Sequence, residues 1–336
     1  MAKYLVTGSA GFIGFHVCQR LLADGHDVIG FDSLSPYYDP ALKKARHDIL
    51  KQSNHFQEQI GSLETPRLLA MLFEEEKPEV VIHLAAQAGV RYSIDEPRSY
   101  VESNLVGTFE LLEAARTHPP KHMLLASTSS AYGANTKMPY AETDKADHQM
   151  SFYAATKKAT EGMAHSYAHL YGLPITMFRF FTVYGPWSRP DMAPLKFANL
   201  ITEGQPIDIY NHGDMQRDFT FVDDLVEGII RLVSAPPVRS DNAPDPGDSL
   251  SPVAPWRVIN IGAGQPVNLM DFIDALETAL GQTAEKNFLE MQPGDVPATW
   301  ADAQLLEKLV GKLPQTPLET GVEQFVDWFK SYYKKP

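Results

Sequence analysis

The sequence has a single cysteine, Cys18, among 336 residues. One cysteine can form neither an internal disulfide nor a thiolate metal site, so the sequence predicts a protein of a reducing compartment, the cytoplasm. Basic residues are also scarce, because 29 Lys and Arg stand against 42 Asp and Glu, for a formal net charge of −13. Such an acidic chain repels nucleic acid and anionic membranes at long range, so we expect neither as a partner.

Long hydrophobic runs are absent as well. No apolar run approaches the roughly 20 residues that a membrane span needs, and we expect no signal peptide because residues 3–7 enter a short β-rich segment directly. The composition that remains, 44% hydrophobic and 21% charged residues, is typical of a globular protein. A chain of 336 residues is long enough for two closely packed domains.

Short β-rich segments alternate with longer helical ones through the first half of the chain. The predicted strands are 3–7, 26–32, 79–86, 121–128 and 174–181. Several are continuously apolar, which is typical of strands covered by helices on both faces of a parallel sheet. Helices are predicted between the first two strands and at 99–117 and 151–171. This βαβ pattern predicts an α/β fold with a doubly wound parallel sheet, a Rossmann domain.

A glycine motif follows the first predicted strand, where Gly8, Gly11 and Gly14 form GxxGxxG in TGSAGFIG at the start of a helix. Without Cβ atoms, backbone N–H groups can approach a pyrophosphate, and the helix N-terminus adds partial positive charge. Asp32 ends the second strand, where a carboxylate can bond both ribose hydroxyls and repel a 2′-phosphate. The motif therefore predicts a bound dinucleotide, NAD rather than NADP.

Tyr153 and Lys157 lie four residues apart in a predicted helix, so their side chains leave it from one face. A phenol with a reference pKa of about 10 is a poor base, but a neighbouring cation favours the phenolate, which can take a proton from a sugar hydroxyl. This spacing is common by chance. Here it follows a hydroxyl cluster, 127–130, beyond the fifth strand. We expect these hydroxyls to face the cofactor, although they could simply make the loop hydrophilic.

Together these segments resemble the extended short-chain dehydrogenase/reductase family of nucleotide-sugar epimerases and dehydratases. The resemblance covers almost the whole chain and is carried by TGSAGFIG, Asp32, AAQAGVRYS (85–93), STSSAYG (127–133), the YxxxK pair and RFFTVYGP (179–186). Within this family, DSLSPYYDP (32–40), AAQAGVRYS and SRPDMA (188–193) most resemble UDP-glucuronate 4-epimerases. The resemblance implies an isomerase that converts UDP-glucuronic acid to UDP-galacturonic acid through a transient 4-keto sugar, with NAD as cofactor.

The resemblance also implies roles for individual residues. Tyr153 becomes the acid/base, Lys157 tunes it and bonds the nicotinamide ribose, and Thr128 holds the reacting sugar oxygen. Arg189 is expected to bind the sugar carboxylate and Arg217 the diphosphate. The further expected substrate contacts are Gln87, Arg91, Ser129, Ser130 and Thr182. The expected cofactor contacts are Gly8, Gly11, Phe12, Ile13, Gly14, Asp32, Ser62, Leu63, Leu84, Ala85, Ala86, Asn104, Tyr153 and Lys157.

Two further features of the sequence bear on the cofactor and on a possible metal. The family usually has an Asp that contacts adenine where this chain has Ser62, and a hydroxyl is a weaker hydrogen-bond partner than a carboxylate. Asp223 and Asp224 could suggest a metal pair, but we interpret them as the cap of a helix that continues through Leu225. The expected chemistry requires no metal.

Three other functions remain open. A UDP-glucose 4-epimerase shares the catalytic residues and differs at C6 of the sugar, so Arg189 and the 85–93 segment discriminate it. A UDP-glucuronate decarboxylase or a dehydratase normally has an acidic residue after the Thr128 position, where this chain has Ser129 and Ser130. A non-catalytic NAD-binding regulator would have little reason to keep both Tyr153 and Lys157.

The pattern and the resemblance together predict two lobes and a homodimer. The NAD-binding Rossmann domain is expected at 1–182 plus about 219–261, and the smaller α/β nucleotide-sugar lobe at about 183–218 plus 262–336. The segment 235–256 is dense in Pro, Asp and Ser, which predicts a surface loop. Helices at 99–117 and 151–171 commonly form a dimeric four-helix bundle in this family.

Overall fold

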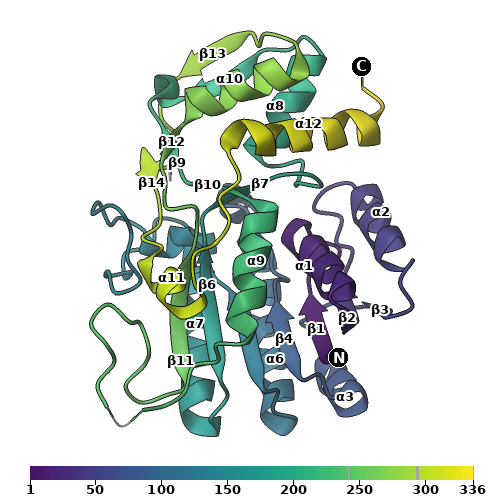
Figure 1. Cartoon of the computed structure of the whole chain (residues 1–336), viewed down its shortest axis with the longest axis vertical. Helices are drawn as coiled ribbons and strands as arrows, with labels where there is room; N and C mark the ends of the chain where they lie inside the picture. The colour runs from purple at the N-terminus through teal and green to yellow at the C-terminus, as the bar shows by residue number, and fades with distance from the viewer. Residues whose placement is uncertain (241, 293–294, 336) are drawn as a thin grey trace.

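A computed structural model describes residues 1–240, 242–292 and 295–335, and its central element is a seven-stranded parallel sheet (Figure 1). The strands are β1 (Lys3–Thr7), β2 (Asp27–Asp32), β3 (Phe56–Ile60), β4 (Val80–His83), β5 (His122–Ala126), β6 (Ile175–Phe180) and β11 (Trp256–Ile261). Their order is β11-β6-β5-β4-β1-β2-β3, so the direction of winding reverses between β1 and β4. Ligands of open α/β sheets bind outside the carboxyl ends of the strands at this reversal.

Helices cover both faces of the sheet, which confirms the predicted fold class. On one face lie α1 (Phe12–Ala23), α9 (Val222–Val233) and α11 (Gln304–Val310). On the other lie α3 (Leu68–Glu76), α6 (Gly107–Thr117) and α7 (Phe152–Tyr171). Each face has its own apolar core, and α9 shows why: Leu225, Ile229 and Leu232 repeat at helical spacing and are all buried. Shorter elements are α2 (Pro40–Leu50), α4 (Tyr92–Asp95), α5 (Pro97–Tyr100) and η2 (Ser129–Tyr132).

A smaller lobe lies at the top of Figure 1, above the carboxyl ends of the sheet strands. Its helices are α8 (Ala193–Thr202), α10 (Leu269–Leu280) and α12 (Leu318–Tyr333), with the short turn η3 (Asn211–Gly213). Its strands, together with those that lead into it, are β7 (Thr182–Tyr184), β8 (Ile207–Tyr210), β9 (Gln216–Arg217), β10 (Phe219–Phe221), β12 (Val267–Asn268), β13 (Lys286–Leu289) and β14 (Ala298–Thr299). An aromatic core holds the lobe together, in which Phe219 stacks on Phe272 at 4.3 Å between ring centroids.

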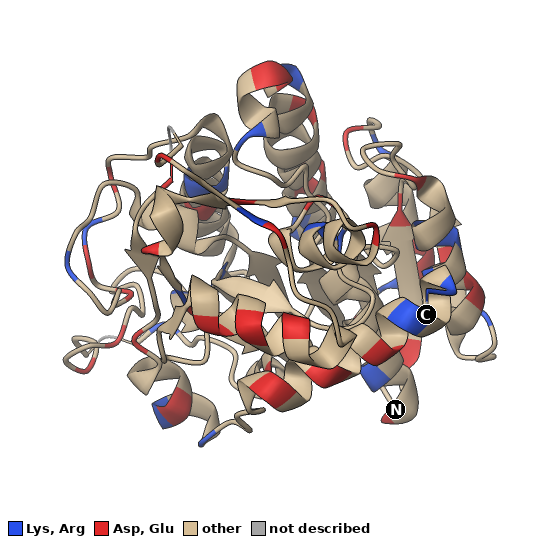
Figure 2. Ribbon diagram, turned by 90° about the horizontal axis from the view of Figure 1, so that it is seen from above, with Lys and Arg blue, Asp and Glu red and all other residues tan. Residues whose placement is uncertain are grey.

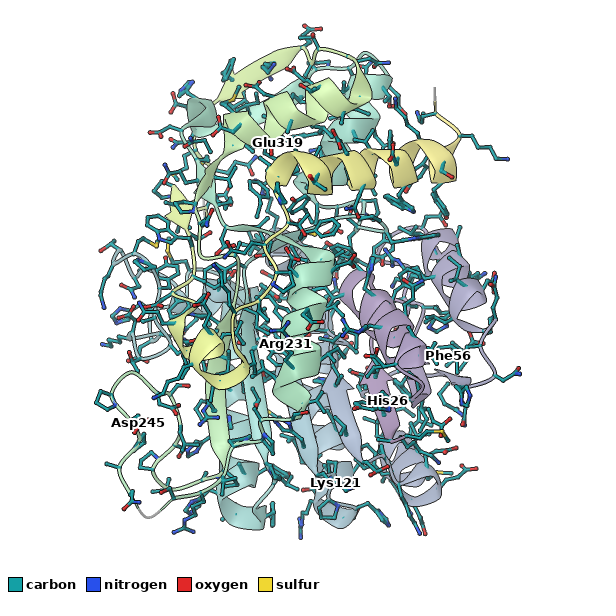
Figure 3. All side chains as sticks on the ribbon, in the orientation of Figure 1. His26, Phe56, Lys121, Arg231, Asp245 and Glu319 are labelled. Carbon is teal, nitrogen blue, oxygen red and sulfur yellow. The ribbon has the colours of Figure 1, made fainter. Side chains whose placement is uncertain are left out.

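The C-terminal segments connect the two lobes. The α11 helix packs on α9 and β11, so part of the range expected in the sugar lobe lies against the large sheet. From there the chain crosses to α12, and Arg231 of α9, labelled in Figure 3, donates to the carbonyl of Lys312 at 2.9 Å on the way. The described part of 235–255 contains no helix or strand, and Asp245, also labelled in Figure 3, pairs with Lys308 of α11 at 2.6 Å.

Two local interpretations from the sequence need correction. The helix predicted at 99–117 is not one regular α-helix, because a π-helical segment, η1 (Val101–Val106), lies between α5 and α6. Within it, Asn104 is buried and bonds the backbone of Gln87. Such π segments are frequent near functional sites. The interpretation of Asp223 and Asp224 as a helix cap is wrong, because α9 begins at Val222 and Asp224 accepts hydrogen bonds from Thr316 instead.

The surface reflects the composition. Figure 2 shows acidic positions on many of the helices seen from above, with basic positions fewer and scattered among them. Within the described ranges, no helix is long and apolar enough to cross a membrane.

Candidate active site

The turn between β1 and α1 is packed so closely that only glycine fits. A Cβ atom on Gly14 would lie 2.0 Å from the carbonyl oxygen of Gly8, and one on Gly8, where φ is +75°, would lie 2.7 Å from the amide nitrogen of Ala85. The amide of Gly11 donates to that same Gly8 carbonyl at 2.9 Å. A turn without side chains at the start of a helix gives a pyrophosphate direct access to backbone N–H groups, so the geometry fits a dinucleotide.

Asp32 is fixed at the end of β2, beside this turn. One carboxylate oxygen accepts from the amide of Ala10 at 3.0 Å, and the other accepts from the amide of Leu34 at 2.8 Å. Both bonds hold the side chain at the rim of the cavity described next. This is where the carboxylate of a dinucleotide-binding fold meets the adenosine ribose hydroxyls.

A cavity of about 490 Å³ opens at the carboxyl ends of the strands and brings most of the expected site residues together. The expected residues that line it are Gly8, Gly11, Phe12, Ile13, Gly14, Asp32, Leu63, Leu84, Ala85, Ala86, Gln87, Thr128, Ser129, Ser130, Tyr153, Lys157, Thr182 and Arg189. Its size lies within the range of small-molecule and cofactor sites.

Four expected residues do not line this cavity. Ser62 lies in the turn after β3 while its neighbour Leu63 faces the cavity, and Asn104 acts through the backbone of Gln87. Arg91 pairs with Asp295 at 3.2 Å and lies over the ring of Tyr210. Arg217 donates to the backbone carbonyls of Gln216 and Pro297, at 2.8 and 3.1 Å.

Tyr153 stands in the first turn of α7, which begins where the Ser151 hydroxyl accepts from the amide of Ala154 at 3.1 Å. Burial raises the pKa of Tyr153, and hydrogen bonding with the Thr128 hydroxyl and the charge of Arg189 partly offset that increase. Desolvation of the phenolate is the largest of these effects, and the tuning of the phenol by Lys157 stays a prediction.

Lys157 lies one turn further along α7 and is buried. Desolvation lowers the pKa of its ammonium group to about 8, and the carboxylate of Glu161 partly counteracts this. A lysine with this pKa changes its charge close to physiological pH. It can therefore act as more than a fixed positive charge.

The segment 127–130, which carries four hydroxyl side chains, is held in place by a buried ion pair between Glu161 and Arg179. The Ser127 hydroxyl donates to Glu161 at 2.7 Å, and Arg179 grips both oxygens of the same carboxylate at 2.9 and 2.8 Å. Thr128 follows directly, and its hydroxyl accepts from the amide of Ser130 at 3.2 Å. The ion pair thus fixes the segment from which Thr128 reaches Tyr153.

Arg189 enters the cavity from the loop between β7 and α8, held by an acidic neighbour. Its guanidinium group donates to both oxygens of Asp191, at 3.0 and 2.6 Å, and Tyr37 donates to the same carboxylate at 3.1 Å. Although burial raises the pKa of Asp191, the charge of Arg189 brings it below the usual value. Arg189 therefore remains charged and oriented.

Sequence reasoning missed the side chains of the segment that follows Asp32. Ser33, Tyr37, Tyr38 and Lys43 all line the cavity, and the ammonium group of Lys43 donates to the carbonyl and the hydroxyl of Ser35 at 2.9 Å each. For Ser33, Tyr37 and Tyr38 the signal was present in DSLSPYYDP (32–40), which carried part of the family resemblance, whereas Lys43 lies beyond it. A role for its side chains requires the contact with the loop that carries Asp191.

A nucleotide cradle and a tyrosine-lysine pair in one cavity of a doubly wound fold define a class of NAD-dependent sugar-nucleotide enzymes. The sequence matches the NAD dependent epimerase/dehydratase family over residues 4–242, and the chain belongs to this family. It is 56% identical over 335 residues to a Rhizobium meliloti protein named probable UDP-glucuronate 4-epimerase, covering 99% of this chain and 98% of that protein.

Other relatives point in the same direction. UDP-glucuronate 4-epimerase 1 of Arabidopsis thaliana is 45% identical, and the match covers 98% of this chain and 77% of that protein. The crystal structure of UDP-glucuronic acid 4-epimerase from Bacillus cereus, in complex with UDP-glucuronic acid and NAD, superimposes with a TM-score of 0.87 at 33% identity. That match covers 98% of this chain and 100% of the other.

Proposed function

We propose that this protein is an NAD-dependent 4-epimerase that interconverts UDP-glucuronic acid and UDP-galacturonic acid. The observation that carries the proposal is the presence of Arg189 in the same cavity as the glycine turn and the Tyr153–Thr128 pair. An arginine at that position gives a sugar carboxylate a bidentate partner within reach of the acid/base residue. The names and bound ligands of the relatives described above support the same substrate.

Cofactor and substrate have separate sets of residues. The turn at Gly8, Gly11 and Gly14 would hold the pyrophosphate of NAD, Asp32 the adenosine ribose, and Lys157 the nicotinamide ribose. When bound, NAD⁺ supplies the acceptor for the C4 hydride, its later return, and a positive charge. We propose that the division into lobes follows the same separation, with residues 1–182 and about 219–261 binding the cofactor.

Tyr153 is the residue that moves the proton. As phenolate it takes the proton of the C4 hydroxyl, while the Thr128 hydroxyl holds the C4 oxygen and fixes its direction. The protonated Lys157 stabilises the phenolate. After the 4-keto sugar has turned its other face to the cofactor, Tyr153 returns the proton to the C4 oxygen, and the configuration at C4 is inverted.

Arg189 has a second task in this scheme. A 4-keto-glucuronate is a β-keto acid, which loses CO₂ when the C5–C6 bond aligns with the carbonyl π system. A guanidinium group already held by Asp191 can keep the C6 carboxylate out of that alignment. Ser129 and Ser130 stand where an additional acid/base would otherwise assist elimination.

The diphosphate would bind outside the main cavity. Arg91 comes from the Rossmann half and pairs with Asp295, whose charge also acts on Arg217 of β9. Two guanidinium groups that both interact with the charge of one carboxylate are suited to a dianion that replaces it. We therefore keep both residues as diphosphate contacts.

We also propose a homodimer located in the cytoplasm. Apolar side chains remain exposed on the paired helices α6 and α7, among them Phe109 at 44%, Phe152 at 42% and Leu170 at 64%. Exposed apolar side chains on two helices that pack together support an interface at this face. The cytoplasm is favoured because Cys18, the single cysteine, is a buried free thiol.

The proposed function is tested by incubating the purified protein separately with UDP-glucuronic acid and UDP-glucose and resolving the products. We expect UDP-galacturonic acid from the first, without added NAD, because the cofactor stays bound through turnover. Denatured protein should release NAD. Turnover of UDP-glucose alone would make the protein a UDP-glucose 4-epimerase, and release of CO₂ as the main product would make it a decarboxylase.

Replacing Arg189 by Ala tests the substrate assignment directly. Loss of a charge-assisted hydrogen bond of about 1.5–3 kcal/mol should raise the KM for UDP-glucuronic acid roughly tenfold to more than a hundredfold. Turnover of UDP-glucose should barely change, and the variant should release a decarboxylated 4-keto-pentose with accumulation of NADH. Unchanged KM and no release of this product would show that Arg189 does not bind the carboxylate.

A further inference from the structure

The segment that carries Arg189 is held by the cofactor half of the molecule. Three consecutive carbonyls precede Arg189, and each accepts a hydrogen bond from α1 or α2. His16 of α1 donates to the carbonyl of Pro186 at 2.9 Å, since a carbonyl can only accept. Arg46 of α2 donates to the carbonyls of Trp187 and Ser188, at 2.6 and 3.4 Å.

Arg46 also holds the glycine turn. Its other terminal nitrogen donates to the carbonyl of Ala10 at 2.7 Å and to the hydroxyl of Tyr38 at 2.9 Å. Ala10 is the residue whose amide donates to Asp32, so Arg46 and Asp32 grip the turn from its two sides. One guanidinium group thus spans the cofactor turn and the loop that leads to Arg189.

The charge of Arg46 is unusual for a side chain so deeply placed. Its exposure is 0%, and in the described part of the chain no Asp or Glu forms an ion pair with it. Buried charges are normally paired with an opposite charge. Here, carbonyl dipoles from two separate loops and the Tyr38 hydroxyl take the place of a carboxylate, so the energetic cost of burial is offset only while both loops stay in position.

The held segment is also one that would relax without this support. Trp187 has a φ of +61°, a left-handed conformation that is unfavourable for a residue with a side chain. Its ring packs against Phe15 of α1 at 5.4 Å and against Trp328 of α12 at the same distance. Figure 1 shows α1 and α2 next to each other, below the end of α12 that carries the C-terminus.

We propose that Arg46 is a positioning residue that sets the place of Arg189 relative to the bound cofactor. Its planar guanidinium group binds the carbonyls of Trp187 and Ser188, just before Arg189, and the carbonyl of Ala10 in the glycine turn. The backbone before Arg189 is therefore fixed relative to the turn that would hold the pyrophosphate. The position of the sugar carboxylate relative to the bound cofactor is then set by the protein. This inference rests on the proposed function, because it assigns the carboxylate of the substrate to Arg189.

The test uses R46M, R46K, R189A and R46M/R189A in the NAD-loaded protein. R46M should raise the KM for UDP-glucuronic acid about tenfold and release the decarboxylated by-product, as R189A does. Binding of UDP, which has no sugar carboxylate, should change less than about twofold. Because Arg46 acts through Arg189, the double variant should be no worse than R189A.

R46K and a control variant separate positioning from charge and from general stability. Lysine keeps the charge but cannot bridge both loops, so R46K should resemble R46M. R257Q removes a different buried arginine, paired with Asp248 at the amino end of β11, and should leave the KM and the product unchanged. If R46M fails to fold, R46K supports the same comparison. Normal kinetics in R46K, or multiplied effects in R46M/R189A, would overturn the proposal.

A measurement without substrate keeps the inference separate from the proposed function. Amide hydrogen exchange in peptides covering 186–192 should be faster in R46M and R46K than in the parent and in R257Q. If the parent does not convert UDP-glucuronic acid, the proposed function fails, while this measurement still decides whether Arg46 holds the segment. Unchanged exchange in both Arg46 variants would contradict the positioning role.

Discussion

At the residue scale, the site depends on two ionisable side chains whose burial opposes their charged forms. Burial raises the pKa of Tyr153 and lowers that of Lys157 to about 8, so each shift favours the neutral group. The proposed mechanism needs the opposite pair, a phenolate beside an ammonium. The positive charge of bound NAD⁺ and the Thr128 hydroxyl would favour the phenolate, so in the proposed mechanism the active protonation state depends on the cofactor.

Replacing Tyr153 by Phe should lower kcat by about two to four orders of magnitude, the usual contribution of a positioned acid/base. Substrate binding should be largely kept because only a hydroxyl is removed. Thr128→Val should lower kcat by less, since this hydroxyl positions the C4 oxygen without being the main proton acceptor. Steady-state kinetics of both variants measure kcat and KM. Near-normal turnover of the Tyr153 variant would show that Tyr153 is not the acid/base.

Replacing Lys157 by Met should stabilise the protein without cofactor at neutral pH. The folded state lowers the pKa of Lys157 from 10.5 to about 8, so below pH 8 it retains a charge that burial penalises by about 3 kcal/mol. Between pH 8 and 10.5 the unfolded chain binds more protons, so the stability of the parent rises with pH and the advantage of the variant disappears.

Urea unfolding of both NAD-free proteins at pH 7 and at about pH 10 measures this difference. All other titrating groups are shared, so the comparison isolates Lys157. An advantage of equal size at both pH values would mean that Lys157 is not desolvated as described. The same variant should have lost most of its epimerase activity.

At the scale of the element, steric limits shape the β1–α1 unit in addition to its polar contacts. The start of α1 approaches the Gly8 carbonyl so closely that a methyl group at Gly14 would overlap with it. Helix α7 has the reverse situation at Gly162, which is exposed and has no atom within 4 Å of an added Cβ. Gly14→Ala and Gly162→Ala can therefore be compared as a test substitution and its control, since both glycines lie in helices that contribute residues to the site.

Gly14→Ala should destabilise the protein by about 1–3 kcal/mol or more and abolish retention of NAD, because the glycine turn must open to accommodate the methyl group. Gly162→Ala should instead raise stability by about 0.5–1 kcal/mol, since alanine loses less backbone entropy in a helix. Thermal unfolding and the absorbance of released nucleotide report both effects. Retained NAD in Gly14→Ala would show that the turn is not its cradle.

At the scale of the whole molecule, an excess of negative charge surrounds a site that binds a polyanion. The net charge of −13 repels a UDP-sugar at long range. In the proposed binding mode the substrate is held by cations that the fold places locally, Arg189 in the cavity and Arg91 and Arg217 outside it. Arg91 and Arg217 each contact a segment far away in the sequence, at Asp295 and Pro297.

The proposed dimer provides a test at the same scale. Phe109→Asp places a charge on the exposed apolar face of α6 and should dissociate the dimer, because a buried unpaired carboxylate opposes association. Phe288→Asp is the control, since Phe288 is similarly exposed at 47% but lies on β13 of the smaller lobe. Sedimentation at micromolar concentration distinguishes the species. A monomeric parent, or a dimer that survives the Phe109 substitution, would exclude this interface.

The sequence by itself determined the local chemistry and the class of fold. Apolar segments of strand length, separated by helical periodicity, specify a parallel sheet, and GxxGxxG with Asp32 specifies its dinucleotide, because both patterns act over about 30 residues. Tyr153 and Lys157 could be paired from their spacing, since one helix turn fixes their relation. The strands β3 and β11 and the π-helical segment η1 did not stand out, because their form depends on neighbours in the fold.

Only the tertiary structure decided how distant loops meet. It placed Tyr37 on Asp191, the partner of Arg189, brought the 33–43 segment into the cavity and left Arg217 outside it. It also gave Arg46 its two targets, Ala10 and Trp187, which lie 36 and 141 residues away in the chain. The physical reason is that local sequence patterns encode backbone geometry, whereas a buried guanidinium group takes its partners from whichever loops the packing of the lobes brings to it.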